Sequence, residues 1–538
     1  MSDKKVKLTI NGKSVEAAAG TTVFNAAAEN DIFIPHYCYH PDLSVAGVCR
    51  MCMVDIEKNP RLQISCNTPV AEGMVVRTDT EKVKDTVKSV LELHLINHPL
   101  DCPICDKAGE CKLQDFYADY GLYESRMDYE KVHKPKVQDI GTIVLDSERC
   151  ILCSRCVRFT AEVTKTNELG IFNRGDRSVL GTVDNQPLKN DYTGNLADIC
   201  PVGALTAKDF RFKQRVWFLD KTQSVCTLCA HGCNTVVSKN PQTNKLFRVE
   251  PRRNPEVNKS WICDRGRWDF HYVHDENRLS EPKKWVDGMW VEQTWHAAFQ
   301  TLGEEVAATP ENVLVALSTQ MTNEEIADSV SSFAQKGVSA FTWVVDESMA
   351  SEKTPFDGLL KHHDLTPNAR GFEKTMKSLG VSWMNSSQAQ EKLRSGRYSR
   401  LLVLGLEGYE MPGLAALLLA APTNTKIALH ATSQNSFLEK CDWVLPNVSA
   451  FEKSGTLVNA QDRIQKLQAS VPKQFISRDA HQVVWGISQQ SDRKPMNHLR
   501  FQEFFKSLVG AQWLGQNDLD WRKFSKMGVE LESKGAGR

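Results

Sequence analysis

The chain has 538 residues, which is too many for one hydrophobic core and predicts about three to five domains. Its 66 basic and 66 acidic residues balance, which excludes the charge bias of a nucleic-acid-binding or membrane-surface protein. The longest apolar run, Leu414 to Ala421, is much too short to cross a bilayer, so we expect no transmembrane segment.

Cysteine is the most informative residue type. Of sixteen cysteines, fifteen precede residue 264, so the thiols serve one local purpose in the N-terminal half. A disulfide framework is the competing interpretation. It fits poorly because Met1 to Lys7 is polar, no secretory segment follows it, and the chain is far larger than a small disulfide scaffold. We therefore expect a soluble, metal-rich protein of a reducing compartment.

Residues 1–80 follow the element order of a β-grasp ferredoxin. Lys5 to Ile10 and Lys13 to Ala17 are predicted to form a hairpin, because Asn-Gly between them supplies the positive φ angles of a tight turn. Thr21 to Asn30 is predicted as a helix. Cysteines then follow as C-x10-C-x2-C-x13-C, with a longer first gap than in plant-type ferredoxins, and we expect them to hold a 2Fe-2S cluster. The expected ligands are Cys38, Cys49, Cys52 and Cys66. His36 and His40 are expected to be packing residues.

Residues 81–137 place one imidazole beside three thiols. Glu81 to Ile96 has apolar residues at helical spacing, and Pro99 ends that helix at His98. The array H-x3-C-x2-C-x5-C suits a 4Fe-4S cluster whose potential is raised by one neutral ligand; alone, it also fits a zinc site. The expected ligands are His98, Cys102, Cys105 and Cys111. His94, one turn earlier, is expected to be structural.

Residues 138–218 retain three cysteines of one motif of a two-cluster ferredoxin and one cysteine of the other. A C-x2-C-x2-C run is followed, after 43 intervening residues, by a Cys-Pro pair. In two-cluster ferredoxins each run continues to a fourth cysteine that serves the other cluster, but here Thr160 and Ala161 replace the first Cys-Pro. The remaining thiols complete one 4Fe-4S site, an arrangement for which zinc is a poor alternative. The expected ligands are Cys150, Cys153, Cys156 and Cys200.

Residues 219–280 hold a fourth set, spaced C-x2-C-x3-C, with a last thiol after 29 intervening residues. Alone, this set is also compatible with a zinc ribbon. The residues around and after the last thiol resemble the cluster domain that opens molybdopterin oxidoreductases. These residues are Trp261 to Trp268, Asn277-Arg-Leu and Pro282. The expected 4Fe-4S ligands are Cys226, Cys229, Cys233 and Cys263. The four sets use fifteen of the sixteen thiols, plus His98.

Residues 281–538 alternate between strands and helices, which predicts a parallel, doubly wound sheet. The expected strands are Val313 to Ser318, Phe341 to Val345, Leu401 to Leu404 and Lys426 to His430. Thr322 to Gln335 and Gly413 to Ala421 are expected helices. No glycine-rich dinucleotide or nucleoside-triphosphate loop occurs, and the tail from Met527 to Arg538 is expected to be disordered. The fold class is therefore multi-domain α+β: a β-grasp 2Fe-2S ferredoxin, 4Fe-4S domains and a C-terminal α/β domain.

In this order, the four cysteine sets resemble the family of large iron–sulfur subunits of proton-pumping NADH:quinone oxidoreductase, respiratory complex I. The resemblance covers residues 1 to about 280 and continues more weakly to about 470. There, Cys441 to Pro446 and Glu452 to Asn459 look like signatures of the molybdopterin family. No cysteine lies between 264 and 440, and Arg265 stands where that family often has lysine. We expect a retained molybdopterin-oxidoreductase-like fold without a molybdenum ligand, with Cys441 as a buried thiol.

The resemblance implies an electron-transfer subunit with no catalytic residue of its own. Electrons from a flavin- and NADH-binding partner would pass the 2Fe-2S centre, the split-ferredoxin centre and the His98 centre toward quinone. The fourth centre lies off that path in the family, which implies a structural role. The implied cofactors are one 2Fe-2S and three 4Fe-4S clusters, without molybdopterin, flavin or NAD on this chain. The implied location is the peripheral arm on the cytoplasmic side of the inner membrane, beside other hydrophilic-arm subunits.

Two other functions remain compatible with the residues. One is a subunit of an NAD-linked formate dehydrogenase or hydrogenase, although the additional cysteine-rich domain of iron hydrogenases is absent. The other is a structural scaffold held by zinc. Measurement of iron, acid-labile sulfide, zinc and molybdenum in the same sample separates the three.

Overall fold

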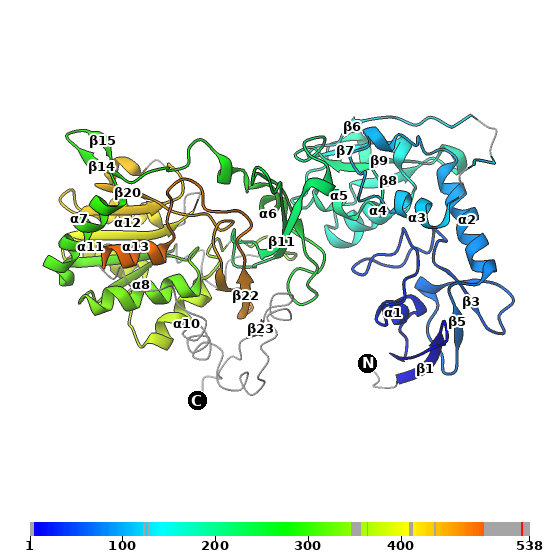
Figure 1. Cartoon of the computed structure of the whole chain (residues 1–538), viewed down its shortest axis with the longest axis horizontal. Helices are drawn as coiled ribbons and strands as arrows, with labels where there is room; N and C mark the ends of the chain where they lie inside the picture. Colours follow the sequence, from blue (N-terminus) through cyan, green and yellow to red (C-terminus); the bar gives the residue numbers. More distant parts are fainter. Residues whose placement is uncertain are drawn as a thin grey trace. The chain divides into compact units, whose positions relative to one another are not determined.

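The computed structural model describes residues 5–121, 124–126, 130–345, 357–362, 364–407, 413–434, 437–488 and 529–530. The chain divides into two compact units, Met1–Leu219 and Asp220–Arg538 (Figure 1). Within the described ranges, no helix has the length and apolar character needed to cross a membrane. The finer division at residues 80, 137, 218 and 280 stays a prediction.

Unit 1 begins with the expected hairpin and helix. Asn11 and Gly12 both adopt positive φ angles at the turn, and Thr22 caps the helix by accepting a hydrogen bond from the Asn25 amide. The hairpin belongs to a sheet of order β2-β1-β5-β3-β4, in which β1 and β5 are parallel. The elements are β1 (Lys5–Ile10), β2 (Lys13–Ala18), α1 (Val23–Ala28), β3 (Met53–Ile56), β4 (Gln63–Ile64) and β5 (Val75–Arg77). Cys52 and Cys66 lie within the core that this sheet forms with α1.

Two helices follow in unit 1. Helix α2 (Glu81–Leu95) is capped by Thr80 and buries Val83, Val87 and Leu91, the helical spacing that its sequence predicts. A 3₁₀ turn at Cys102–Ile104 then leads to α3 (Lys112–Tyr120), whose N-cap is Cys111. Helices α2 and α3 pack together, so the cysteine loop is held between them.

The last part of unit 1 surrounds the C-x2-C-x2-C run. A small antiparallel sheet of order β10-β7-β6 and the hairpin β8–β9 flank two short helices, α4 and α5. The elements are β6 (Gln138–Asp139), β7 (Ile143–Leu145), α4 (Arg155–Arg158), β8 (Leu169–Phe172), β9 (Val179–Thr182), α5 (Asn195–Ile199) and β10 (Leu205–Ala207). Helix α4 begins after Cys153, and α5 ends at the residue before Cys200.

Unit 2 opens with an antiparallel sheet, β11 (Asp220–Val225), β12 (Asn234–Lys239) and β13 (Leu246–Pro251). Helix α6 (Asp264–Trp268) packs on β13. The turn between β11 and β12 carries three cysteines, and Cys263 is the N-cap of α6.

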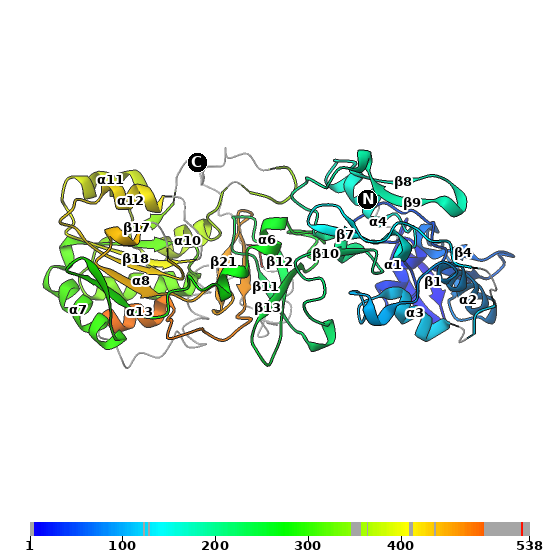
Figure 2. The same cartoon turned by 90° about the horizontal axis from the view of Figure 1, so that it is seen from above.

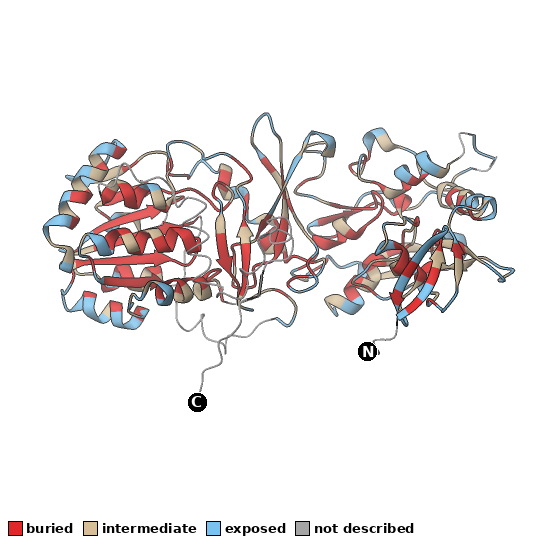
Figure 3. Ribbon diagram, turned by 60° about the horizontal axis from the view of Figure 1, so that its bottom comes forward, coloured by how far each residue is buried: buried red, intermediate tan, exposed pale blue. Residues whose placement is uncertain are grey.

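The rest of unit 2 is built on a seven-stranded sheet of order β15-β14-β20-β19-β18-β16-β17, whose last five strands are parallel. Helices α7, α8, α10 and α13 pack on one face, and α11 and α12 on the other (Figure 2). Figure 3 shows the strands buried between these helices. The strands are β14 (Lys283–Val286), β15 (Met289–Glu292), β16 (Val313–Ser318), β17 (Ala340–Val344), β18 (Arg400–Leu406), β19 (Lys426–Ala431) and β20 (Trp443–Pro446). The helices are α7 (Trp295–Ala308), α8 (Asn323–Gln335), α10 (Ala369–Leu379), α11 (Ser386–Arg394), α12 (Leu414–Ala420) and α13 (Ala480–Ile487).

The parallel, doubly wound sheet expected from the sequence is confirmed.

A last sheet joins β21 (Gly455–Val458), β22 (Arg463–Leu467) and β23 (Val529–Glu530). The tail expected to be disordered lies outside the described residues, apart from β23. For these two residues the expectation is wrong, because they pair with Arg463 and Ile464 of β22.

Candidate metal centres

All sixteen cysteines lie in described segments, and every one is a free thiol. A disulfide framework is therefore not the reason for the high cysteine content. Fifteen of these thiols belong to the four sets expected from the sequence.

The first set lies where the Cys38–Cys52 loop meets the β-grasp core. The Cys38 amide donates to Cys49 Sγ at 3.4 Å. Hydrogen bonding from the Cys49 thiol lowers the pKa of Cys38 to about 5 and raises that of Cys49. Cys66 likewise bonds Cys52, whose pKa falls to about 7. Cys38 also interacts electrostatically with Cys52 and Cys66, so the fold brings all four thiols together.

The second set lies in the loop between α2 and α3, with His98 near the start of the loop and Cys111 at its end. Burial lowers the pKa of His98 to about 4, so its imidazole is neutral, the form that binds metal. His98, Cys102 and Cys111 line one cavity of about 650 Å³. Cys105 does not line this cavity, but it interacts electrostatically with Cys102 and Cys111.

Local backbone geometry shapes this second set. Burial raises the pKa of Cys111 to about 11, and the amides of Leu113 and Gln114 donate to its sulfur at the start of α3. Cys105 Sγ packs so closely on Gly203 that a Cβ at this position would overlap the sulfur. Lys131 donates to the His98 carbonyl oxygen, which fixes the backbone of the one histidine in the set.

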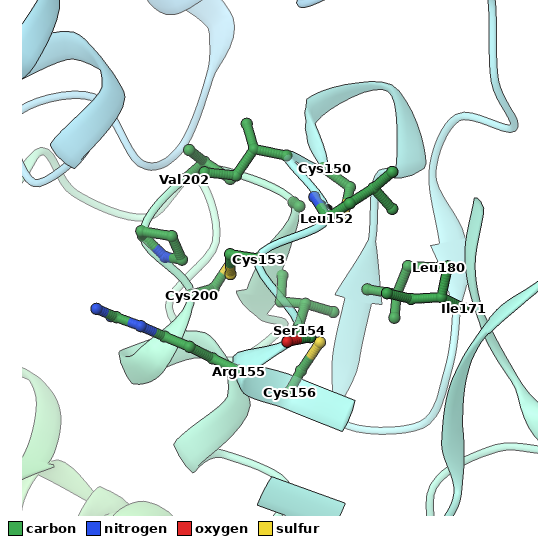
Figure 4. Close-up of a pocket in the computed structure, with 14 residues that line it drawn as sticks. Cys150, Leu152, Cys153, Ser154, Arg155, Cys156, Ile171, Leu180, Cys200 and Val202 are labelled. Atoms are coloured by element: carbon green, nitrogen blue, oxygen red, sulfur yellow. Dashed lines mark hydrogen bonds between the residues drawn. The ribbon is translucent and has the colours of Figure 1, made fainter. Parts of the chain in front are cut away.

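The four thiols of the third set all line a single cavity (Figure 4). Helix α5 brings Cys200 to the run across 43 intervening residues, and Figure 4 shows it beside Cys153. Apolar side chains complete the walls, among them Ile171, Leu180 and Val202. Burial raises the pKa of Cys150 to about 12 and that of Cys153 to about 11. These thiols thus share an enclosed, low-dielectric space.

The fourth set lies in unit 2, between the β11–β12 turn and α6. Cys233 interacts electrostatically with the other three thiols, and the Cys226 amide donates to its carbonyl oxygen at 2.8 Å. Burial raises the pKa of Cys263 to about 11, and the Gly266 amide donates to Cys263 Sγ at 3.4 Å. The nearby cavity beside Phe270 is lined by Cys226 but not by the other three thiols.

The donor chemistry of these sets fits iron–sulfur clusters. Within the described ranges, the structure groups no three His, Cys, Asp or Glu side chains closely enough to hold a metal ion, so the case for clusters rests on the chemistry of the donors. Four donors in each set (four thiols in three sets, and three thiols with one imidazole in the other), backbone amides aimed at sulfur and buried surroundings are the features that stabilise clusters. In addition, the buried Tyr37 hydroxyl has no hydrogen-bond partner within the described ranges and interacts with the thiols of Cys49 and Cys111, so it is placed to donate to sulfur.

The other histidines near these sets have ordinary packing contacts. His36 Nδ1 lies 3.0 Å from the Ile34 carbonyl oxygen, and its ring packs edge-on against Phe24. His40 Nδ1 accepts from the Asp42 amide at 3.2 Å. His94 Nε2 lies 3.4 Å from the Cys49 carbonyl oxygen, so this side chain joins α2 to the first cysteine loop.

Sequence analysis missed a group of arginines interleaved with the third set. Arg149, Arg155 and Arg158 lie among Cys150, Cys153 and Cys156 in the sequence, but the partners of Arg155 are 44 and 116 residues away, so no short motif identifies its contacts. Arg149 pairs with Asp101, the neighbour of Cys102, at 2.5 Å. The other two arginines extend toward the loop of the first set.

Family models match four separate regions of the chain. Residues 3–81 match a 2Fe-2S iron-sulfur cluster binding domain. Residues 88–126 match the NADH-ubiquinone oxidoreductase-G iron-sulfur binding region. Residues 141–206 match the ferredoxin-like domain of NADH-quinone oxidoreductase subunit 3. Residues 219–271 match the 4Fe-4S domain described as NADH-ubiquinone oxidoreductase NDSU1/NuoG-like.

Curated relatives agree with these matches. The NADH-quinone oxidoreductase G subunit of Rickettsia conorii is 36% identical over 332 residues, covering 62% of this chain and 49% of that protein. NADH-quinone oxidoreductase subunit 3 of Thermus thermophilus is 37% identical, covering 60% and 45%. The mitochondrial 78 kDa subunit of NADH-ubiquinone oxidoreductase from Candida albicans is 40% identical, covering 55% and 41%. The chain thus spans about half the length of the curated relatives it matches.

A solved structure of an NAD+-reducing [NiFe]-hydrogenase in the H2-reduced state is also similar, with 31% identity. The match covers 39% of this chain and 91% of that one, with a TM-score of 0.37.

Fold and matches together define a multi-domain iron–sulfur protein of the ferredoxin type. Within that class, residues 88–126, 141–206 and 219–271 match iron–sulfur domains described for NADH-quinone and NADH-ubiquinone oxidoreductase subunits, and the curated relatives are similar to this chain over about 60% of its length.

Proposed function

We propose that the chain is an iron–sulfur electron-transfer subunit of a proton-pumping NADH:quinone oxidoreductase. The names of its relatives and its four matched domains support this assignment. The structural observation that carries it is the single apolar cavity lined by Cys150, Cys153, Cys156 and Cys200. Its partners would be the flavin- and NADH-binding subunit and other subunits of the peripheral arm, on the cytoplasmic side of the membrane.

The proposed ligand sets are those expected from the sequence. Each bound cluster would accept and release one electron at a time without making or breaking covalent bonds. The chain's own residues would bury the clusters, donate amide hydrogens to sulfur and, at His98, supply one neutral ligand. No catalytic acid, base or nucleophile is needed.

Contacts within unit 1 support the order of transfer, from the first set through the third to the second. The first and third sets are joined by Arg158, which donates to the carbonyl oxygens of Cys38 and Cys153. The third and second are joined where Gly203 packs on Cys105. The Lys112 amide, next to Cys111, also donates to the Pro201 carbonyl oxygen at 2.9 Å.

We further propose that the seven-stranded domain is a molybdopterin-oxidoreductase-like fold that binds no such cofactor. Ligands of doubly wound sheets bind at the carboxyl ends of strands where the strand order reverses, here β16 and β18. At that position Lys453 is buried and pairs with Glu407 at 3.0 Å and Glu325 at 3.3 Å. This ion cluster fills the position with the chain's own side chains.

The test is metal and sulfide analysis of the anaerobically purified full-length chain, with electron paramagnetic resonance (EPR) after reduction. We expect about 14 iron atoms per chain, one 2Fe-2S signal and 4Fe-4S signals, and no stoichiometric molybdenum. A colourless protein containing zinc would refute the assignment and support a scaffold. Stoichiometric molybdenum would support the formate dehydrogenase class instead.

A further inference from the structure

Two buried arginine contacts connect the loops of the first and third sets. Arg155 donates from Nη1 to the Ile199 carbonyl oxygen at 3.1 Å and from Nη2 to that of Tyr39. These acceptors are the neighbours of Cys200 and Cys38, so one side chain contacts the backbone of both sets. Figure 4 shows Arg155 extending from the start of α4 past Cys153 and Cys200.

Arg158, one turn further along, makes parallel contacts. Its Nη2 donates to the Cys38 carbonyl oxygen at 2.5 Å and to that of Cys153 at 3.5 Å, and its Nη1 donates to the Ser44 carbonyl oxygen. Arginine stays protonated in proteins, so both side chains bring a permanent positive charge.

The positive charge of Arg155 has no carboxylate partner among the described residues. The side chain belongs to a residue that is 6% exposed, and in this part of the chain its hydrogen bonds go to carbonyl oxygens alone. The groups with which it interacts favourably are the thiols of Cys153, Cys200 and Cys38. A buried charge is costly unless an opposite charge compensates it. Here the compensating charge can come from the anionic centres on either side.

We propose that Arg155 and Arg158 are positioning residues that hold the first and third centres together and raise the reduction potentials of both. This inference rests on the proposed function. In the transfer, one electron passes between the two centres, and no bond or proton changes place. Reduction makes a centre more negative, so a fixed positive charge nearby stabilises the reduced state.

Glu162 offers a matched control because it joins the same two loops with the opposite charge. It accepts from the Ser44 amide at 2.8 Å and from the Ser44 hydroxyl. If the contacts only tether the two loops, removing the arginine link or the Glu162 link should shift the reduction potentials of the two centres in the same direction. A role of charge predicts that losing an arginine lowers both potentials and that Glu162→Gln does not.

The experiment is an EPR-monitored redox titration of the full-length chain, purified anaerobically with its iron. We expect Arg155→Gln and Arg158→Gln each to lower the equilibrium constant for one-electron reduction of both centres about tenfold, which is 59 mV. The variants Arg155→Lys and Arg158→Lys should recover most of this shift, because lysine restores the charge. Arg158→Gln provides the measurement of charge loss if Arg155→Gln does not fold.

The outcomes separate the two proposals. If the parent chain lacks iron and sulfide, the proposed function fails. If the parent and the variants hold both centres but the potentials coincide, only the role of the arginines fails. If Glu162→Gln lowers both potentials as much as Arg158→Gln does, the contacts are tethers and the charge has no part.

Discussion

At the residue scale, His98 places a neutral imidazole where the other proposed sites have thiols. Burial keeps its pKa near 4, so it carries no charge at neutral pH. A thiolate in its place would add one negative charge and disfavour reduction. We predict that His98→Cys keeps the iron of this centre and lowers its midpoint potential in an EPR titration. The exposed His133, changed to Gln, should leave that potential unaltered. Equal midpoints in His98→Cys and the parent would contradict the assignment of His98 as a ligand.

Gly203 is a second residue whose identity matters for this centre. A Cβ there would overlap Cys105 Sγ and approach Cδ of Arg149 at 3.3 Å, so the loop must move to accommodate one. We predict that Gly203→Ala costs about 1–3 kcal/mol of stability and reduces the iron content. Denaturant unfolding and iron analysis measure the two effects. In Gly170→Ala, where a Cβ would meet the partly exposed Phe172 ring, both should be close to the parent. Unchanged iron and stability in Gly203→Ala would show that Cys105 is not held against this glycine.

At the element scale, the imidazole of His481 in α13 contacts the carboxylate of Asp328 in α8. His481 Nδ1 lies 2.7 Å from Asp328 Oδ2. Burial alone would lower the pKa of His481, but the Asp328 hydrogen bond and the charges of Glu325 and Asp479 raise it to about 8. Because the folded pKa lies above the ordinary 6.5, this stabilisation is complete below about pH 6.5 and is lost as the pH rises through about 8.

We therefore predict that the free energy of unfolding contributed by His481 is about 2 kcal/mol at pH 6 and small at pH 9. The measurement is urea unfolding of the parent and of His481→Gln at both pH values. The difference between the two proteins isolates this side chain from the thiols, which also titrate at high pH. A difference that is the same at pH 6 and pH 9 would contradict the role of the charged pair.

The sequence predicts elements well where one local rule decides them. Val313 to Ser318 is a strand at the predicted residues, and Thr322 caps α8 with a capping box, because apolar runs and cap chemistry act over a few residues. Spacing also predicts four ligand sets, and the fold places the four thiols of the third set around one cavity. Spacing could not identify Arg155, since its partners Tyr39 and Ile199 are separated from it by 116 and 44 residues. Contacts of this kind depend on tertiary packing, which no short motif encodes.

At the scale of the whole molecule, three proposed centres belong to unit 1 and the fourth to unit 2. The loop of the fourth set is held by the domain that follows it. Asn459 Nδ2 donates to the His231 carbonyl oxygen at 3.1 Å, and Gln465 Nε2 donates to that of Gly232 at 2.6 Å. The Ala460 amide donates to the Ala230 carbonyl oxygen at 2.7 Å. The loop of the fourth set therefore joins the β11–β13 sheet to the β21–β22 sheet within its own unit.

Removing a ligand of the fourth centre should consequently affect stability more than turnover. Metal binding that exists only in the folded state adds its free energy to folding, so we predict that Cys229→Ala lowers the stability of unit 2 by at least about 3 kcal/mol. In an assembled complex, the NADH:quinone rate should stay close to that of the parent, because the three centres of unit 1 are intact. Cys153→Ala, in the third set, should instead abolish that rate. If the Cys229→Ala complex assembles fully but loses the NADH:quinone activity, the fourth centre must lie on the electron path. That path would then include unit 2.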